Sequence, residues 1–306
     1  MIYDDYHYRI PEGKRIRLII DTDAKNEGDD QYCIVHALLS PRFDIRGIIA
    51  AHFGEQKSRT SMLDSYKEIC KLLTLMEMPQ ELAYHGLPCS IGKAEVTESE
   101  GTDRIIEEAL ADNDLSLYVI CLGPLTNIAA AYKKEPAIAG RMTVIWIGGG
   151  AYPDGEPEYN LSNDIDAANI VFASDLEVWQ IPKNAYNQVI VSMAELEDKV
   201  YPCGEIGRYL FEQMEAFGHT KWALMTQRTG EYWRMGDSPA VGVLLFPHND
   251  CYSFHPAPYI TENMAYEAAK KEHMIRVYHR VDTRAIMEDF YAKIRIFARK
   301  KGELHS

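Results

Sequence analysis

The residues with the clearest capacity for chemistry are the carboxylates of one short acidic segment. The stretch LIIDTDAKNEGDD follows an apolar run and places five acidic residues within ten positions: Asp21, Asp23, Glu27, Asp29 and Asp30. Carboxylates at this density repel one another unless they are solvated or share a cation. Ca²⁺ takes about six to eight oxygen ligands, so these side chains are candidate ligands for a hard divalent ion. The alternative is a solvated acidic turn in which Asp29 or Asp30 caps the helix that follows.

The elements that must position these side chains are expected from the alternation of apolar runs with helical patterns. Such alternation is typical of βα units and a largely parallel sheet. Strands are expected at 17–20, 45–51, 82–84, 117–122, 142–147, 177–180 and 275–281. Helices are expected at 31–39, 60–75, 102–110, 128–136, 167–174, 204–233, 239–245 and 284–299. We therefore expect an α/β fold, with an open, mostly parallel, Rossmann-like sheet flanked by helices and residues 1–306 forming a single domain.

The expected strands also give the site a location. Four of them end in loops rich in Asp, Gly or Asn: residues 21–30, the region around His52, Leu122 with Gly123, and residues 148–160. In open α/β sheets, ligands bind at the carboxyl ends of the strands. We therefore expect these four loops at one edge of the sheet, and we expect Thr126 to cap the helix that follows Leu122 and Gly123.

Composition excludes several classes of protein. The formal net charge is −14, whereas a nucleic-acid binder normally presents a basic face, so we expect no nucleic-acid partner. A neutral substrate, or one bound through a cation, suits such an acidic chain better than a free phosphate. No apolar run of ~18 residues and no signal-peptide core is present, so we expect a cytoplasmic protein without a membrane partner. The six cysteines form no C-x-x-C pair and are expected to be reduced.

The acidic segment resembles the opening motif of the nucleoside hydrolase family, a strand followed by D-x-D and a later D-D pair. Asp21-Thr22-Asp23 and Asp29-Asp30 match it, although the five-residue spacer is longer than usual and contains Asn26 and Glu27. Three further segments resemble the family in the same order: GPLTNIA at 123–129, EYNLSNDIDAANIVF at 158–172 and GDSPAVGV at 236–243. The chain is thus similar to the inosine-uridine preferring nucleoside hydrolases, as a divergent branch.

This resemblance implies calcium-dependent hydrolysis of the N-glycosidic bond of a ribonucleoside or related riboside. It implies that Asp23 is the general base that activates a metal-bound water. The Ca²⁺ ligands it implies are Asp23, Asp30, Asp237 and the carbonyl of Leu122, and the sugar contacts it implies are Asp29, Glu158 and Asn160. It also implies a small-molecule riboside as the partner and a homodimer or homotetramer. Because nothing indicates a covalent intermediate, we expect inversion at C1′.

The chain departs from the family pattern at residues that would contact the substrate. The late family His, a leaving-group acid in one branch, is replaced by Gly236. Candidates to protonate or stack on the leaving base are His219, Trp222, Tyr232 and Trp233, with ordinary helix packing as the alternative for both tryptophans. The family Asn after the second strand is also replaced, which makes His52 a candidate sugar ligand or a structural histidine. Asn26, in the longer spacer, completes the candidate substrate contacts.

Two other functions remain open. A riboside-binding protein that keeps the calcium site without turnover would explain the missing His and Asn. A Mg²⁺-dependent phosphatase is suggested because IIDTD resembles the D-x-D strand end of haloacid dehalogenase-type phosphatases. The later Ser/Thr and Lys that such phosphatases need have no convincing counterpart. A phosphate-release screen distinguishes the phosphatase from the glycosidase.

Overall fold

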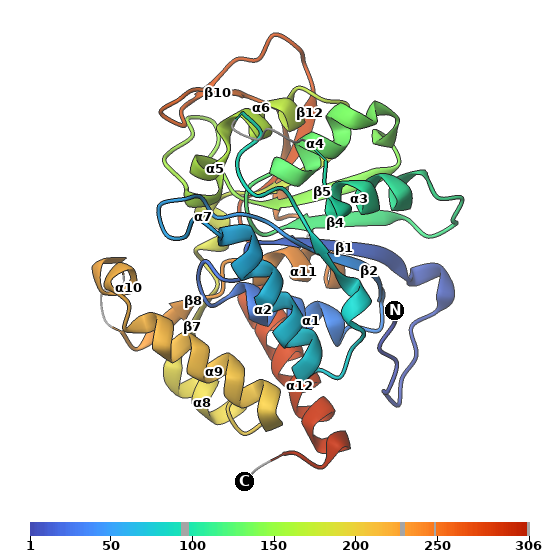
Figure 1. Cartoon of the computed structure of the whole chain (residues 1–306), viewed down its shortest axis with the longest axis vertical. Helices are drawn as coiled ribbons and strands as arrows, with labels where there is room; N and C mark the ends of the chain where they lie inside the picture. Colours follow the sequence, from blue (N-terminus) through green and yellow to red (C-terminus); the bar gives the residue numbers. More distant parts are fainter. Residues whose placement is uncertain (93–97, 227–229, 248, 305–306) are drawn as a thin grey trace.

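An eight-stranded sheet runs through the middle of the computed structural model, between two layers of helices (Figure 1). The structure describes residues 1–92, 98–226, 230–247 and 249–304. In spatial order the strands are β3 (Ala83–His85), β2 (Phe43–Ala50), β1 (Ile16–Thr22), β4 (Leu117–Cys121), β5 (Met142–Ile147), β6 (Glu177–Ile181), β12 (Met274–Tyr278) and β9 (Tyr252–Pro256). All neighbours pair in parallel except β12 and β9, so the predicted open, mostly parallel sheet is confirmed.

Helices cover both faces of this sheet. One face packs against α1 (Asp30–Leu38), α2 (Ser61–Leu75), α11 (Ser238–Leu245) and α12 (Thr283–Lys301). The other face packs against α3 (Glu100–Leu110), α4 (Thr126–Lys134) and α6 (Ile165–Phe172). Every residue of β1 is buried, because a central parallel strand is covered on both sides. The same burial explains why this strand reads as a continuous apolar run.

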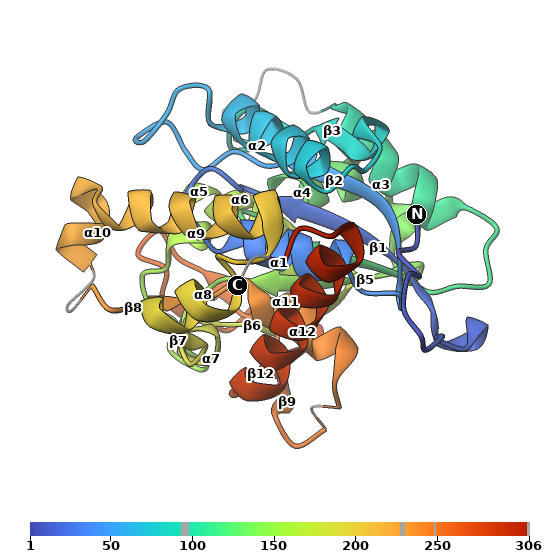
Figure 2. The same ribbon diagram turned by 90° about the horizontal axis from the view of Figure 1, so that it is seen from below.

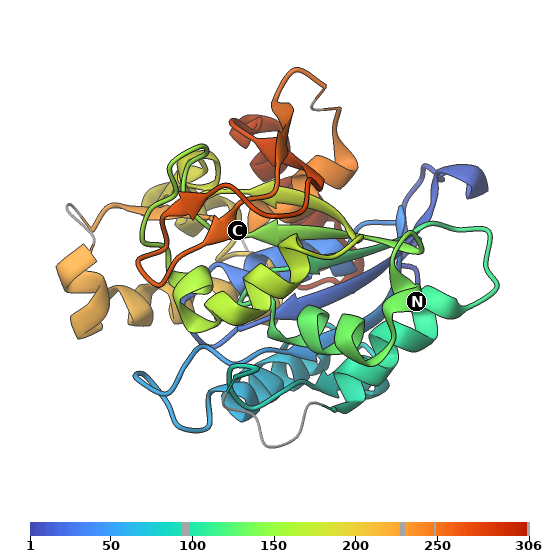
Figure 3. The same cartoon turned by 90° about the horizontal axis from the view of Figure 1, so that it is seen from above.

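The remaining elements are short or lie at the periphery. Short helices are α5 (Tyr159–Asn163), α7 (Lys183–Tyr186) and α8 (Met193–Lys199). Helix α9 (Gly204–Gly218) leads to α10 (Lys221–Thr226), which lies at the outer end of the molecule in Figures 2 and 3. Two small antiparallel pairs join β7 (Ile190–Ser192) to β8 (Tyr232–Arg234) and β10 (Tyr259–Ile260) to β11 (Tyr266–Glu267). Within the described ranges, none of the helices combines the length and apolar character needed to span a bilayer.

Two local predictions are wrong. Residues 204–233 do not form one helix, because α9 ends at Gly218 and Trp233 lies in β8, paired with Val191 of β7. Aromatic residues favour strands, and here the missed strand β7 supplies the partner. Thr126 does not cap α4: Leu125 holds the cap position, and the Thr126 hydroxyl donates to Asp164 Oδ2 at 2.7 Å.

The strand register brings the four predicted loops to one edge. Asp21 in β1 lies beside Ile49 in β2 on one side and Cys121 in β4 on the other. Cys121 in turn lies beside Trp146 in β5. Because these strands are parallel, the segments that follow them leave the sheet at the same edge. This confirms the location that the sequence predicts for the site.

Candidate active site

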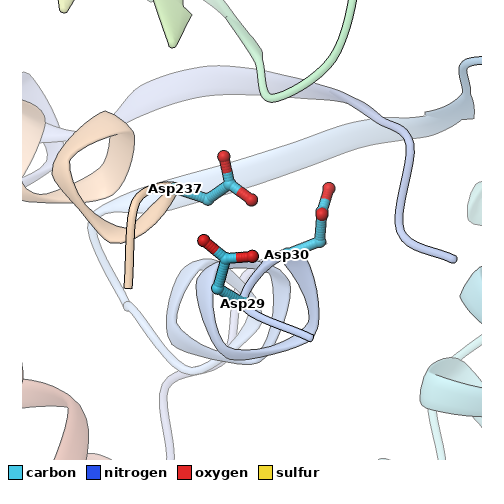
Figure 4. A group of neighbouring side chains, drawn as sticks. All are labelled: Asp29, Asp30 and Asp237. Carbon is cyan, nitrogen blue, oxygen red and sulfur yellow. The ribbon is translucent and has the colours of Figure 1, made fainter. Parts of the chain in front are cut away.

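Three aspartates from two separate helices converge at this edge (Figure 4). Asp29 and Asp30 lie at the start of α1, and Asp237 lies at the start of α11. Each contributes one carboxylate oxygen to a group in which all oxygens lie within 4.8 Å of one another. All three residues are at most 9 % exposed. The two helix N-termini place their positive dipole ends near these carboxylates, which offsets part of the repulsion.

Neither helix uses its aspartate as a conventional cap. The side chains of Asp29 and Asp237 occupy the cap positions of α1 and α11 but accept no capping hydrogen bond. Both side chains are buried rather than solvated. The alternative of a solvated, helix-capping acidic turn therefore does not describe this segment.

The cluster is held close although its charges repel. The Thr22 hydroxyl donates to Asp30 Oδ1 at 2.5 Å, and one oxygen of Asp30 lies within 4.8 Å of one oxygen of Asp237. Burial raises the pKa of Asp30 to about 6. Burial, followed by the charge of Asp30, raises the pKa of Asp29 and of Asp237 well above the usual range. Proximity that is this unfavourable for ionised groups indicates a site built to hold positive charge.

Asp23 lies beside this cluster, and one of its carboxylate oxygens has no hydrogen-bond partner among the described residues. It follows β1 directly and is 1 % exposed. Among the described residues, its Oδ2 atom has no hydrogen-bond partner. A Cβ atom at Gly123 would lie 3.0 Å from Asp23 Cγ, so the glycine of the GPLTN segment allows the two loops to approach. Burial, then the charge of Asp30, raises the pKa of Asp23 well above its usual range.

The donor set fits a hard divalent cation. Its clustered members offer carboxylate oxygen rather than imidazole or thiolate, and hard ions such as Ca²⁺ and Mg²⁺ prefer oxygen. The unpartnered oxygen of Asp23 is a further donor at the same place. The sequence predicts Asp23, Asp30, Asp237 and the Leu122 carbonyl as ligands. The structure brings Asp29 into the tightest group and places Asp23 and Leu122 in the same pocket wall.

One pocket brings most of the predicted site residues together. The predicted residues that line it are Asp23, Asn26, Asp29, Asp30, Leu122, Glu158, Asn160 and Asp237. Glu27 of the acidic segment and Gly236 of the last motif line it as well. Sequence reasoning missed Ile147, Tyr159 and Tyr186. Tyr159 lies inside the EYN motif and could have been found there, whereas nothing in the sequence marks Tyr186.

Asn160 ties two strand ends together at the pocket wall. Its Nδ2 donates to the Leu122 carbonyl at 2.7 Å and to the Ile147 carbonyl at 2.9 Å. Its Oδ1 accepts no hydrogen bond from any residue that the structure describes, so this oxygen is available to a ligand hydroxyl. The Leu122 carbonyl keeps a second lone pair for a cation.

Glu158 is held by four donors. Its Oε1 accepts from the backbone N–H of Asn160 at 3.2 Å and from the Tyr186 hydroxyl at 2.9 Å. Its Oε2 accepts from the backbone N–H groups of Gly149 and Leu161, both at 2.9 Å. These bonds satisfy about four acceptor sites of an ionised carboxylate. A direct bond to a sugar hydroxyl would require one of the four donors to give way.

Tyr186 fills the space beside the residue that replaces the family histidine. A Cβ atom at Gly236 would lie 3.3 Å from Tyr186 Cδ2 and 3.3 Å from Asp29 Oδ2. The ring of Tyr186 therefore packs where a side chain at position 236 would begin. The tyrosine links Glu158 to the start of α11, and any side chain at position 236 would contact its ring.

His52 lies outside the pocket lining, in a buried hydrogen-bonded chain. The backbone N–H of Gly54 donates to its Nδ1 at 3.3 Å, and its Nε2 lies 2.8 Å from the Thr126 hydroxyl. Because Nδ1 accepts, Nε2 carries the proton and donates to Thr126, which donates to Asp164. The structure therefore places His52 as a structural histidine rather than a sugar ligand.

The four candidates for the leaving-group side are placed very differently. Trp233 is buried in β8 and packs edge-on against Phe217 at 5.4 Å, away from the pocket lining. Tyr232 lies in the same strand, and the exposed His219 pairs with Glu215. Only Trp222, of these four, contacts the pocket wall: its Nε1 donates to Glu27 Oε1 at 3.3 Å. Trp233 thus packs from strand β8 against Phe217 of α9.

Comparison with known proteins adds a family-level finding. The model of the family described as inosine-uridine preferring nucleoside hydrolase matches residues 18–289. Among curated proteins, the pyrimidine-specific ribonucleoside hydrolase RihB of Escherichia coli strain SE11 is 26 % identical over 215 residues, covering 62 % of this chain and 67 % of that protein.

Solved structures show the same fold. The purine-preferring ribonucleoside hydrolase from Gardnerella vaginalis matches with a TM-score of 0.76 and 22 % identity, covering 93 % of this chain and 99 % of that one. The plant nucleoside hydrolase PpNRh1 matches with a TM-score of 0.71 and 18 % identity, covering 92 % and 99 %. At these identities, the structural likeness concerns the fold alone.

Proposed function

This chain belongs to the inosine-uridine preferring nucleoside hydrolase family, whose members are enzymes that cleave N-ribosyl bonds, and on that premise we propose that it hydrolyses a ribonucleoside or related riboside with Asp23 as general base. The observation that carries this proposal is the convergence of buried carboxylates from the first and last motifs in one pocket. The relatives named above differ in their stated base preference, so the nucleobase is left open.

The proposed cation is Ca²⁺, held by Asp30 and Asp237 together with Asp23, Asp29 or the Leu122 carbonyl. When bound there, such an ion would supply Lewis acidity to a water molecule and would help to orient the sugar diol. Asp23 then removes the proton from the attacking water, because its Oδ2 atom is free to accept it. Oxygen Oδ1 of Asn160, in the same pocket, accepts from a sugar hydroxyl.

The carboxylates also act on the sugar itself. Cleavage of a glycosidic bond passes through an oxocarbenium-like transition state with positive charge near C1′. Preorganised negative groups stabilise that charge without reorganising during the reaction. Direct attack by water predicts inversion at C1′, which NMR of the freshly released ribose would show.

The test is turnover by the purified protein with CaCl₂ and a panel of purine and pyrimidine ribonucleosides, with free base measured by chromatography. We expect release of base, and a fall of about 10²- to 10⁴-fold for Asp23→Ala and Asp23→Asn. Asp112→Asn, in an exposed loop, is the matched control and should retain full turnover. Wild-type rates in the Asp23 variants would remove the proposed base.

The same assay addresses the alternatives. Tight riboside binding without product over hours would favour the non-catalytic binder that the departures from the family pattern suggest. The phosphatase alternative rested on the Asp21-Thr22-Asp23 segment alone, and the family match over residues 18–289 now accounts for that segment.

We also propose a homodimer or homotetramer, which sedimentation of the same preparation would test.

A further inference from the structure

A lysine that no motif identifies lies against the wall of the pocket. Lys57, in the segment between β2 and α2, donates from Nζ to Asn26 Oδ1 at 2.5 Å. The same atom lies 4.0 Å from Glu27 Oε1 and 4.4 Å from the centroid of the Tyr159 ring. Asn26, Glu27 and Tyr159 all line the pocket. A proton-bearing ammonium group is therefore present at the edge of the site.

The surroundings of Lys57 suit a flat heterocycle. Its Nζ also lies 4.8 Å from the centroid of the Trp222 ring, and the rings of Tyr159 and Trp222 lie 6.0 Å apart with an interplanar angle of 60°. Sugar hydroxyls would instead bind at the carboxylate cluster and the cation proposed there. Aromatic faces provide the large, flat, apolar contact that a nucleobase needs. Lys57 therefore lies on the side of the pocket where the leaving group would bind.

The structure also disfavours the proton donors that the sequence suggests for this side. Position 236 carries a glycine, and the His219 side chain is 76 % exposed and bonded to Glu215. Trp233 and Tyr232 lie in β8, outside the pocket lining. The indole of Trp222 donates its N–H to Glu27, and indole nitrogen is a donor that does not release its proton at neutral pH.

We propose that Lys57 is the catalytic residue that protonates the leaving heterocycle, an inference that rests on the function proposed above. As water attacks C1′, the C1′–N bond breaks and its electron pair passes to the ring nitrogen. The Lys57 ammonium delivers a proton to the leaving heterocycle, and Asp23 takes one from the water. The products are ribose and the neutral base.

Two properties of Lys57 support this role. Burial lowers the pKa of Lys57, which eases release of its proton, although the charge of Glu27 acts in the opposite direction. The side chain keeps 23 % of its surface exposed, so solvent can restore the proton after each turnover.

The test compares two classes of riboside. Ribonucleosides need help for the departing base, whereas p-nitrophenyl β-D-ribofuranoside releases a phenolate that is stable without a proton. For Lys57→Met we expect turnover of inosine and uridine to fall by about 10²- to 10⁴-fold and turnover of the p-nitrophenyl riboside to fall far less. Lys57→Arg should not restore the ribonucleoside rate, because a guanidinium keeps its proton. Lys67→Met, an exposed lysine on α2, is the matched control.

Each outcome decides the matter. Equal losses on both substrates, or full rescue by arginine, would show that Lys57 only balances the charge of the carboxylates and would overturn the proposal. Unchanged ribonucleoside turnover would overturn it too. Absence of wild-type turnover on every riboside would instead reject the proposed function and this inference with it. If Lys57→Met unfolds at lower temperature than wild type, Lys57→Gln, which can still donate to Asn26, replaces it.

Discussion

Asp23 is buried in this site with too few hydrogen-bond partners to stabilise its charge. Asp21 in β1 shows the same property just behind the pocket, where Asn127 donates to its Oδ1 at 2.8 Å and its Oδ2 has no partner among the described residues. Burial raises the pKa of Asp21 to about 7. At neutral pH the acidic segment is therefore destabilised by the burial of its negative charges, which a bound cation would relieve.

The burial of these carboxylates predicts a pH dependence of stability in the cation-free protein. The folded-state pKa values of Asp21 and Asp30, about 7 and 6, lie above that of an aspartate in an unfolded chain. A raised pKa contributes stability that is present at low pH and is lost as pH rises through the folded value. In EDTA, the thermal midpoint should fall as pH rises from about 5 to about 7.5, between the unfolded and folded pKa values of these two groups.

A buried histidine opposes this pH dependence, and a variant of Asp21 supplies the control. Burial lowers the pKa of His36 to about 4, so this histidine makes stability rise with pH up to about pH 7 and partly opposes the fall caused by the aspartates. Asp21→Asn removes the group that titrates nearest to pH 7 and should flatten the slope. A midpoint that rises with pH in the wild-type protein would contradict this account of the acidic segment.

Some residues of the pocket could be predicted from the sequence, and others could not. Asp23, Asp30 and Asp237 could be predicted because each lies in a short motif with a fixed relation to a strand or helix end. Lys57 and Tyr186 could not, because each reaches the pocket from a segment whose path depends on tertiary packing. Trp233 was misplaced for the same reason, since its strand partner in β7 carries no strong signal of its own.

Helix α11 is the element on which the cluster depends most. It positions Asp237, and it packs so closely on α12 that a Cβ atom at Gly242 would lie 2.4 Å from the Cδ1 and Cγ1 atoms of Ile286. The strands that precede the other candidate ligands were predictable from their apolar runs. The close approach of two helices was not, because it depends on one missing methyl group.

The close contact between Gly242 of α11 and Ile286 of α12 predicts the effect of a substitution. Gly242→Ala gains helix propensity of about 1 kcal/mol, but overpacking of this kind costs roughly 1–3 kcal/mol. We expect a net loss in the free energy of unfolding and weaker cation binding, because α11 must move together with Asp237. Urea unfolding and calorimetric titration with CaCl₂ measure the two effects.

The control lies at another helical glycine. At Gly218, the last residue of α9, an added Cβ atom would meet nothing closer than 4.0 Å. Gly218→Ala should therefore leave both quantities nearly unchanged. Equal behaviour of the two variants would show that the approach of α11 to α12 has no part in placing Asp237.

Across the whole molecule, the site joins segments that are distant in sequence. The pocket combines the loop after β1, the ends of β4 and β5, the start of α5 and the start of α11. A cation that binds them contacts the folded state and not the unfolded chain. Its binding energy therefore adds to the stability of the entire fold.

Calcium should raise the thermal midpoint of the protein. At a concentration one hundred times the Kd, binding stabilises the folded state by about 2.7 kcal/mol, which is roughly 5 °C for a chain of this length. Differential scanning fluorimetry with CaCl₂ against EDTA measures the shift. Asp237→Asn removes one of the three clustered carboxylates and should reduce it, whereas Asp175→Asn, an exposed partner of Lys271, should not. No shift at millimolar CaCl₂ would rule out the cation site.

The order of the ligands along the chain has a consequence for biosynthesis. Asp237 lies 207 positions after Asp30, so a ribosome that adds about 5–20 residues per second needs roughly 10 to 40 seconds to join the two. During that interval the nascent acidic segment lacks its third carboxylate. The set that we propose to hold the ion is thus completed late in translation, so metal availability would govern the survival of the finished chain rather than the early steps of its folding.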